Sequence, residues 1–137
     1  MTTLGSQRIP IISLHSNLIV PIQGAIADAV MAQLQDDVTR RIDAGGARGL
    51  VIDVSGIEIM DSFMTRNIRD LALTARLMGV HTVVSGLRPA VAITLVEMGL
   101  EIPGIRTTLD LERALESLTE MHDEEALALS GSADAWH

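Results

Sequence analysis

The chain has 137 residues, of which 47% are hydrophobic, and a formal net charge of -8 at pH 7. That length is typical of one domain, and the hydrophobic fraction is large enough for one core. The absence of cysteine excludes disulfides and thiolate metal sites, and the scattered basic residues in an acidic chain argue against a nucleic-acid partner. No apolar run approaches the roughly 18 residues that cross a bilayer, so we expect a cytoplasmic protein without a membrane partner.

The chain opens with a leader over residues 1–8 and then two short apolar runs. Residues 9–14 and 18–22 flank the turn formers His15, Ser16 and Asn17, which predicts a β-hairpin. A helical period follows from Asp28 and ends at Gly45 and Gly46; its apolar stripe consists of Met31, Leu34, Val38 and Ile42. We therefore predict two antiparallel strands followed by a helix.

The middle and end of the chain alternate between strand and helix patterns. Buried strands are predicted over 50–54, 82–85 and 105–107, and helices begin near Asp61, Pro89 and Asp110. This alternation predicts an α/β fold: a single domain over 9–120, with a mixed, mainly parallel sheet opened by the hairpin and about four helices packed against it. Residues 121–137 carry excess acidic charge without a clear period, so we expect a flexible acidic tail.

The most informative site is the segment from Ile59 to Phe63, where a loop meets a helix. Ser62 falls in the first turn of that helix, just past the carboxyl end of a central strand. Free N–H groups and the helix dipole at this position suit a phosphoryl group. Phosphate would add about -1.5 to -2 charge beside Asp61 and repel an acidic or apolar partner. The alternative is plain capping, because Ser and Asp are common at helix starts.

Three segments resemble the STAS domain of anti-sigma-factor antagonists, and within that family the RsbS-like branch found in stressosomes. They are LVIDVSGIEIMDSF at 50–63, RLMGVHTVVSGLRPAVAITLVEMGL at 76–100 and TTLDLERALESL at 107–118. RsbS-like proteins accept phosphate on the serine of an Asp-Ser-Phe motif, which matches Ser62 here. Sporulation-type antagonists usually follow that serine with a small residue and Gly, whereas this chain has Phe63 and Met64. The departure favours the stressosome branch.

The resemblance implies a phosphorylatable scaffold subunit in stress-response signalling rather than an enzyme. Such a protein would self-associate into a large complex with RsbR-like co-antagonists and sequester an RsbT-like serine kinase until Ser62 is phosphorylated. Asp61, Phe63 and Met64 would then border the kinase-binding surface, although Phe63 fits a core position equally well. A simple sporulation-type antagonist is the alternative within the family.

Enzyme and cofactor readings find little support in the residues. The four histidines are isolated along the sequence, so we predict no catalytic group, no metal site and no cofactor. One candidate anion-binding turn, formed by Ser85, Gly86 and Arg88, leads into the helix at Pro89 and would suit a nucleotide-binding STAS sensor. A strand-to-helix turn shaped by Gly and Pro explains the same residues more simply.

Overall fold

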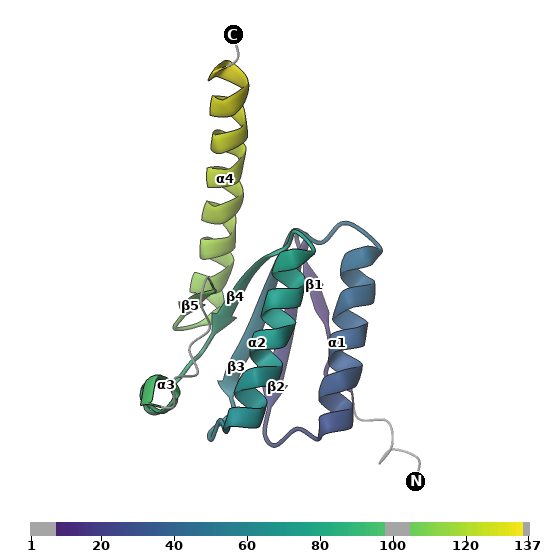
Figure 1. The fold of residues 1–137 in the computed structure, drawn as a ribbon, viewed down its shortest axis with the longest axis vertical. Helices are drawn as coiled ribbons and strands as arrows, with labels where there is room; N and C mark the ends of the chain where they lie inside the picture. Colours follow the sequence, from purple (N-terminus) through teal and green to yellow (C-terminus); the bar gives the residue numbers. More distant parts are fainter. Residues whose placement is uncertain (1–7, 98–104, 136–137) are drawn as a thin grey trace.

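A mixed five-stranded sheet forms the centre of the molecule. The structure is a computed structural model that describes residues 8–97 and 105–135. Its elements are β1 (Ile12–Leu14), β2 (Asn17–Gln23), α1 (Asp28–Asp43), β3 (Gly49–Gly56), α2 (Ser62–Leu77), β4 (His81–Ser85), α3 (Pro89–Glu97), β5 (Arg106–Thr108) and α4 (Leu111–Ala135). The strands lie in the order β1-β2-β3-β4-β5, with β1 antiparallel to β2 and the other neighbours parallel (Figure 1). The predicted mainly parallel sheet with an antiparallel edge and four helices is confirmed.

The opening hairpin is tighter than its sequence suggests. His15 and Ser16 both adopt positive φ angles of 49° and 70°, and they form a two-residue turn closed by the pair Leu14 and Asn17. Turns of this kind have a twist that matches the flanking strands. β1 is shorter than the predicted run over 9–14, because Pro10 has no N–H to donate to a strand ladder. Ile9 is still buried in the core.

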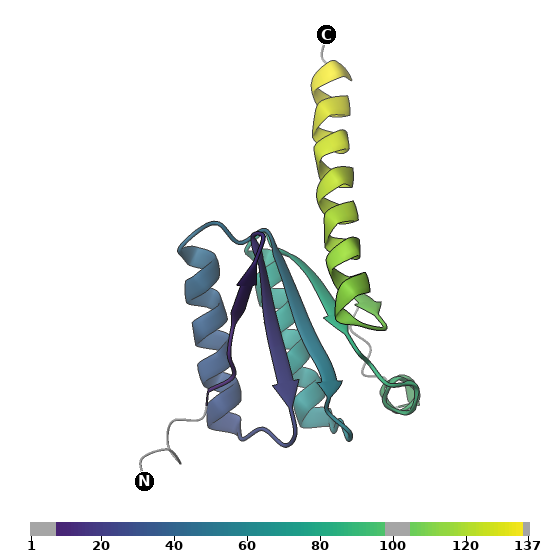
Figure 2. The ribbon, with the colours of Figure 1, turned by 180° about the vertical axis from the view of Figure 1, so that it is seen from behind.

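The helices cover the two faces of the sheet unequally. Figures 1 and 2 show α1 and α2 on one face and α4 on the other. The larger core lies between the sheet and α1 and α2, and the smaller one consists of Ile19, Val51 and Val83 packed on Ala114 and Leu118 of α4. The central strands are therefore buried on both sides, which explains their nearly continuous apolar sequence.

α4 is much longer than predicted, and this corrects the expected tail after Met121. The helix continues without a break to Ala135, and residues 136–137 lie outside the described part of the chain. The Ala, Leu and Glu residues that dominate 124–129 are strong helix formers, and they sustain the helix after its apolar stripe has passed the sheet. The prediction relied on the hydrophobic period alone and therefore placed the end of this helix too early. None of the described helices is long and apolar enough to span a membrane.

Gly86 holds the close approach between the end of β4 and β3. Its φ is +80°, and an added Cβ would lie 2.9 Å from backbone atoms of Ser55. We expect Gly86→Ala to lower the free energy of unfolding by about 3 kcal/mol, because strain and a backbone clash act together. The matched control is Gly79→Ala, where φ is +88° but the space is open, and we expect a loss of about 1 kcal/mol. Equal losses in urea unfolding would contradict the role of the clash.

Candidate functional site

The loop between β3 and α2 is fixed to the core by two buried side chains. Ile57 and Met60 are buried, whereas Glu58 and Ile59 are exposed. The N–H of Ile57 donates to the carbonyl of Val54 at 3.0 Å, which turns the chain directly after the strand. The loop therefore presents defined side chains to solvent from a rigid base.

Asp61 is the N-cap of α2, as its sequence position predicts. Its carboxylate accepts a hydrogen bond from the N–H of Met64 at 2.8 Å. Its carbonyl accepts from the N–H of Thr65 at 3.0 Å and from the hydroxyl of Thr65 at 2.8 Å. These contacts satisfy a helix start that would otherwise leave its N–H groups unpaired.

Ser62 is the first residue of α2, and its side chain is half-buried rather than enclosed. Among residues 8–97 and 105–135, its hydroxyl has no hydrogen-bond partner. The cap uses the N–H of Met64, so the N–H groups of Ser62 and Phe63 stay outside the helix ladder. An oxygen at this position can therefore gain a substituent without breaking an existing contact.

The two residues after Ser62 point in different directions. Phe63 is 41% exposed, so its aromatic ring lies at the surface and not in the core. Met64 is only 6% exposed and packs in the main core with Ile68 and Leu71. The prediction that Met64 borders a partner surface is therefore wrong, because its position in the helical period places it on the buried stripe of α2.

Exposed apolar side chains occur in the loop before α2, on the first turn of α2 and on α3. A shallow pocket of about 160 Å³ between the loop and α3 is lined by Glu58, Ile59, Met60, Ala90 and Val91. The two elements that border it expose Ile59 at 86%, Ile93 at 59% and Val96 at 64%. We call Ile59, Phe63, Ile93 and Val96 the apolar rim.

Sequence reasoning missed three members of the apolar rim. The available signal was the composition of α3, which places apolar residues at positions 91, 92, 93, 95 and 96. One buried face of such a helix cannot accommodate all of these apolar side chains. An excess of this kind on a short helix indicates either a buried helix or an exposed contact surface.

Two of the three residues of the candidate anion-binding turn are buried and paired within the protein. Ser85 is fully buried, and its hydroxyl donates to the carboxylate of Asp53 at 3.4 Å. The N–H of Gly86 donates to the carbonyl of Thr108 at 2.9 Å, and the guanidinium of Arg88 donates to the carbonyl of Ser55 at 3.3 Å. Ser85 and the N–H of Gly86 are thus already paired with the protein, and the exposed guanidinium of Arg88 is the part of the predicted site that still faces solvent.

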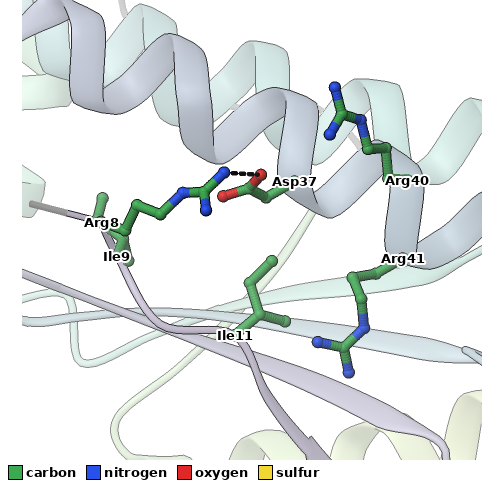
Figure 3. A pocket seen from close by; sticks show the side chains of 6 residues that line it. All are labelled: Arg8, Ile9, Ile11, Asp37, Arg40 and Arg41. Atoms are coloured by element: carbon green, nitrogen blue, oxygen red, sulfur yellow. Dashed lines mark hydrogen bonds and ion pairs between the residues drawn. The ribbon is translucent and has the colours of Figure 1, made fainter. Parts of the chain in front are cut away.

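A second pocket lies away from Ser62, beside α1. Figure 3 shows Arg8, Arg40 and Arg41 around this opening of about 320 Å³, with Ile9, Ile11 and Asp37. Arg8 donates to Asp37 at 3.2 Å, and Arg40 pairs with Asp36 at 2.7 Å. Two of the three arginines are therefore neutralised by α1 itself. The described residues contain no group of three His, Cys, Asp or Glu side chains placed to hold a metal ion.

The comparisons with known proteins agree with this architecture. The STAS domain model matches residues 8–114. The chain belongs to the STAS domain family. Two solved chains are similar to it. The first is RsbS of Moorella thermoacetica with a serine-to-glutamate substitution, at 34% identity and a TM-score of 0.76. The second is a chain from a structure of the stressosome, at 36% identity and a TM-score of 0.74. The first match covers 85% of this chain and 99% of the other, and the second covers 82% and 98%.

A longer relative carries the same domain. The RsbT co-antagonist protein RsbRA of Bacillus subtilis is 22% identical over 121 residues, which is 88% of this chain but only 44% of RsbRA. The chain thus spans less than half the length of this relative. The resemblance to stressosome STAS proteins that the sequence indicated is confirmed.

The cap at Asp61 generates a stability prediction. We expect Asp61→Ala to lower the free energy of unfolding by about 1 kcal/mol, because the N–H of Met64 loses its acceptor. Asp61→Asn keeps an oxygen acceptor and serves as the control, with a loss of only a few tenths of a kcal/mol. Chemical denaturation of both variants provides the measurement, and the cap assignment fails if Ala and Asn have the same effect.

Proposed function

We propose that this protein is a phosphorylatable scaffold subunit of a stressosome-type complex that binds an RsbT-like serine kinase. Phosphorylation of Ser62 by that kinase releases it. The observation that carries the proposal is the half-buried Ser62 at the start of α2 within an Asp-Ser-Phe sequence, whose hydroxyl has no hydrogen-bond partner among the described residues. The similarity to RsbS supports the assignment of the phosphorylated residue.

The switch works through charge at an apolar surface. The kinase docks on the apolar rim, where Ile59 and Phe63 lie on either side of Ser62 in the sequence. A phosphoryl group adds about -1.5 to -2 charge next to the capping carboxylate of Asp61. Removing such a charge from water against apolar side chains is unfavourable, so the complex weakens and the kinase is released.

The domain itself tolerates the modification. The N–H groups of Ser62 and Phe63 remain outside the helix ladder, and the positive end of the helix dipole favours an anion at this point. The neighbouring buried residues Met60 and Met64 keep their contacts. Phosphorylation therefore changes the surface and leaves the fold intact.

Assembly belongs to the same proposal. The protein self-associates and joins RsbR-like co-antagonists in a large cytoplasmic complex, in which it contributes one kind of STAS subunit. The similarity to a chain of the stressosome and to the matching part of RsbRA supports this arrangement. One complex then carries several copies of the kinase-binding surface.

The first test is direct phosphorylation. We expect an RsbT-like kinase with ATP to transfer one phosphoryl group to the wild-type protein and none to Ser62→Ala, measured by intact mass. Ser55→Ala is the matched control, because Ser55 is an exposed serine near the same end of the sheet. Phosphate on Ser62→Ala would remove Ser62 from the proposal.

The second test separates the charge mechanism from folding. We expect Ser62→Asp and Ile59→Asp each to weaken kinase binding at least about tenfold, which corresponds to roughly 1.4 kcal/mol. Ile12→Asp, at an exposed apolar position on β1, is the control and keeps wild-type affinity. All three variants should unfold within about 1 kcal/mol of the wild type, since surface changes seldom have larger effects. Unchanged affinity of Ser62→Asp contradicts the mechanism.

A further inference from the structure

α4 has two parts with different surroundings. Up to Met121 it packs on the sheet through Ala114 and Leu118, whereas residues 123–130 are exposed. We call residues 123–130 the distal segment. Figures 1 and 2 show this part of α4 standing beyond the sheet. Isolated helices of this length are marginal in water, so the contacts where α4 leaves the body determine how firmly the distal segment is held.

Those contacts come from a polar cluster at the amino-terminal end of the parallel strands. The Nε2 atom of His81, the first residue of β4, lies 2.6 Å from Oε2 of Glu125. The Nε2 atom of His122 lies 3.1 Å from the carbonyl oxygen of Arg48, just before β3. The two imidazole rings are 5.2 Å apart and inclined by 53°. We call Arg48, His81, His122 and Glu125 the latch.

The latch lines an open pocket at the surface. Its four residues line a pocket of about 240 Å³ together with Ala47, Gly79, Ala126 and Leu129. Three parts of the chain that are far apart in sequence therefore meet here. A change in the charge of one side chain is transmitted directly to the junction between α4 and the sheet.

Glu125 is the acidic side chain on which the positive groups of the latch act. The hydrogen bond from His81, followed by the charge of His81, holds the pKa of the Glu125 carboxyl below its usual value, with smaller contributions from the charges of His122 and Arg48. Arg106 forms ion pairs with two other glutamates of α4. Its guanidinium nitrogens lie 3.5 Å from a carboxylate oxygen of Glu124 and 3.9 Å from one of Glu120. An arginine stays protonated at all ordinary pH values, so that second contact is insensitive to pH.

We propose that the latch is a pH-responsive device that ties the distal segment to the sheet through the ion pair between His81 and Glu125. The pair has its full strength only when the imidazole is protonated and the carboxylate is ionised. Loss of the imidazole proton removes one of the two opposite charges and weakens the pair. When the imidazole is neutral, its N–H can still donate to the ionised carboxylate, but the attraction between two opposite charges is lost.

The acid side has the opposite sign. Because the pKa of Glu125 is lowered in the folded state, its contribution to stability is present above the usual value of 4.5 and is lost as the pH falls through the lowered value. The charge of His122 contributes to the lowered pKa of Glu125, and its ring centroid lies 5.2 Å from that of His81. The contact between His122 and the carbonyl of Arg48 does not itself require a charge. The latch is therefore tightest when His81 carries its proton and Glu125 does not.

Hydrogen exchange of the full-length protein, in buffer with EDTA, tests the proposal. After correction for intrinsic exchange rates, we expect the amides of the distal segment to be about two- to fivefold more protected at about pH 6 than at about pH 8. This difference should vanish in His81→Gln and in Glu125→Gln. The amides of β3 and β4 report whether each variant remains folded.

Two further variants make the result specific. Glu124→Gln removes a partner of Arg106, so it should reduce protection of the distal segment at both pH values and keep the ratio between them. His122→Gln leaves the pair between His81 and Glu125 in place, so protection should still be greater at the lower pH. No difference in the wild type, or a ratio that survives in His81→Gln, overturns the proposal. So does a ratio lost only in His122→Gln. None of these measurements involves Ser62, so their outcome is independent of the proposed kinase switch.

Discussion

Two buried methionines determine where Ser62 lies. Met60 and Met64 are both packed in the main core, and Asp61 caps the helix between them. With these neighbours fixed in the core, Ser62 at the first position of α2 stays only half-buried. The accessibility of the hydroxyl is thus a consequence of core packing and not of a mobile loop. A rigid site of this kind exposes the same geometry to every partner that approaches it.

The sheet places that site at the end where its partners can reach it. Because β2, β3 and β4 run parallel, their carboxyl ends meet at one edge, and the connections to helices gather there. The opposite faces of β3 are covered by α1 and α2 on one side and by α4 on the other. Substitutions on either face therefore act on stability, whereas the proposed function assigns substitutions in the apolar rim an effect on kinase binding.

The residues that sequence patterns located well are those whose local chemistry decides their place. The cap at Asp61, the stripe of α1 and the buried run of β3 were all predicted, because each depends on neighbours along the chain. Met64, two residues of the Ser85 turn and the end of α4 were misjudged. Met64 was grouped with Ser62 by proximity in sequence although its helical position is buried. The donors of the Ser85 turn are occupied by Asp53, Ser55 and Thr108, which belong to other strands. Such long-range pairings leave no signature in a local pattern.

The two polar features of the molecule lie at opposite ends of β3. Ser62 follows its carboxyl end, and Arg48 of the latch precedes its first residue, Gly49. Eight residues of strand separate these ends, which corresponds to about 26 Å at roughly 3.3 Å per residue. The Debye length at physiological ionic strength is only about 8 Å, so a phosphate on Ser62 exerts almost no direct electrostatic force on Glu125. Any coupling between the two features therefore requires a partner large enough to touch both ends of the sheet. A neighbouring protein subunit in a large assembly can do this more readily than a small ligand can.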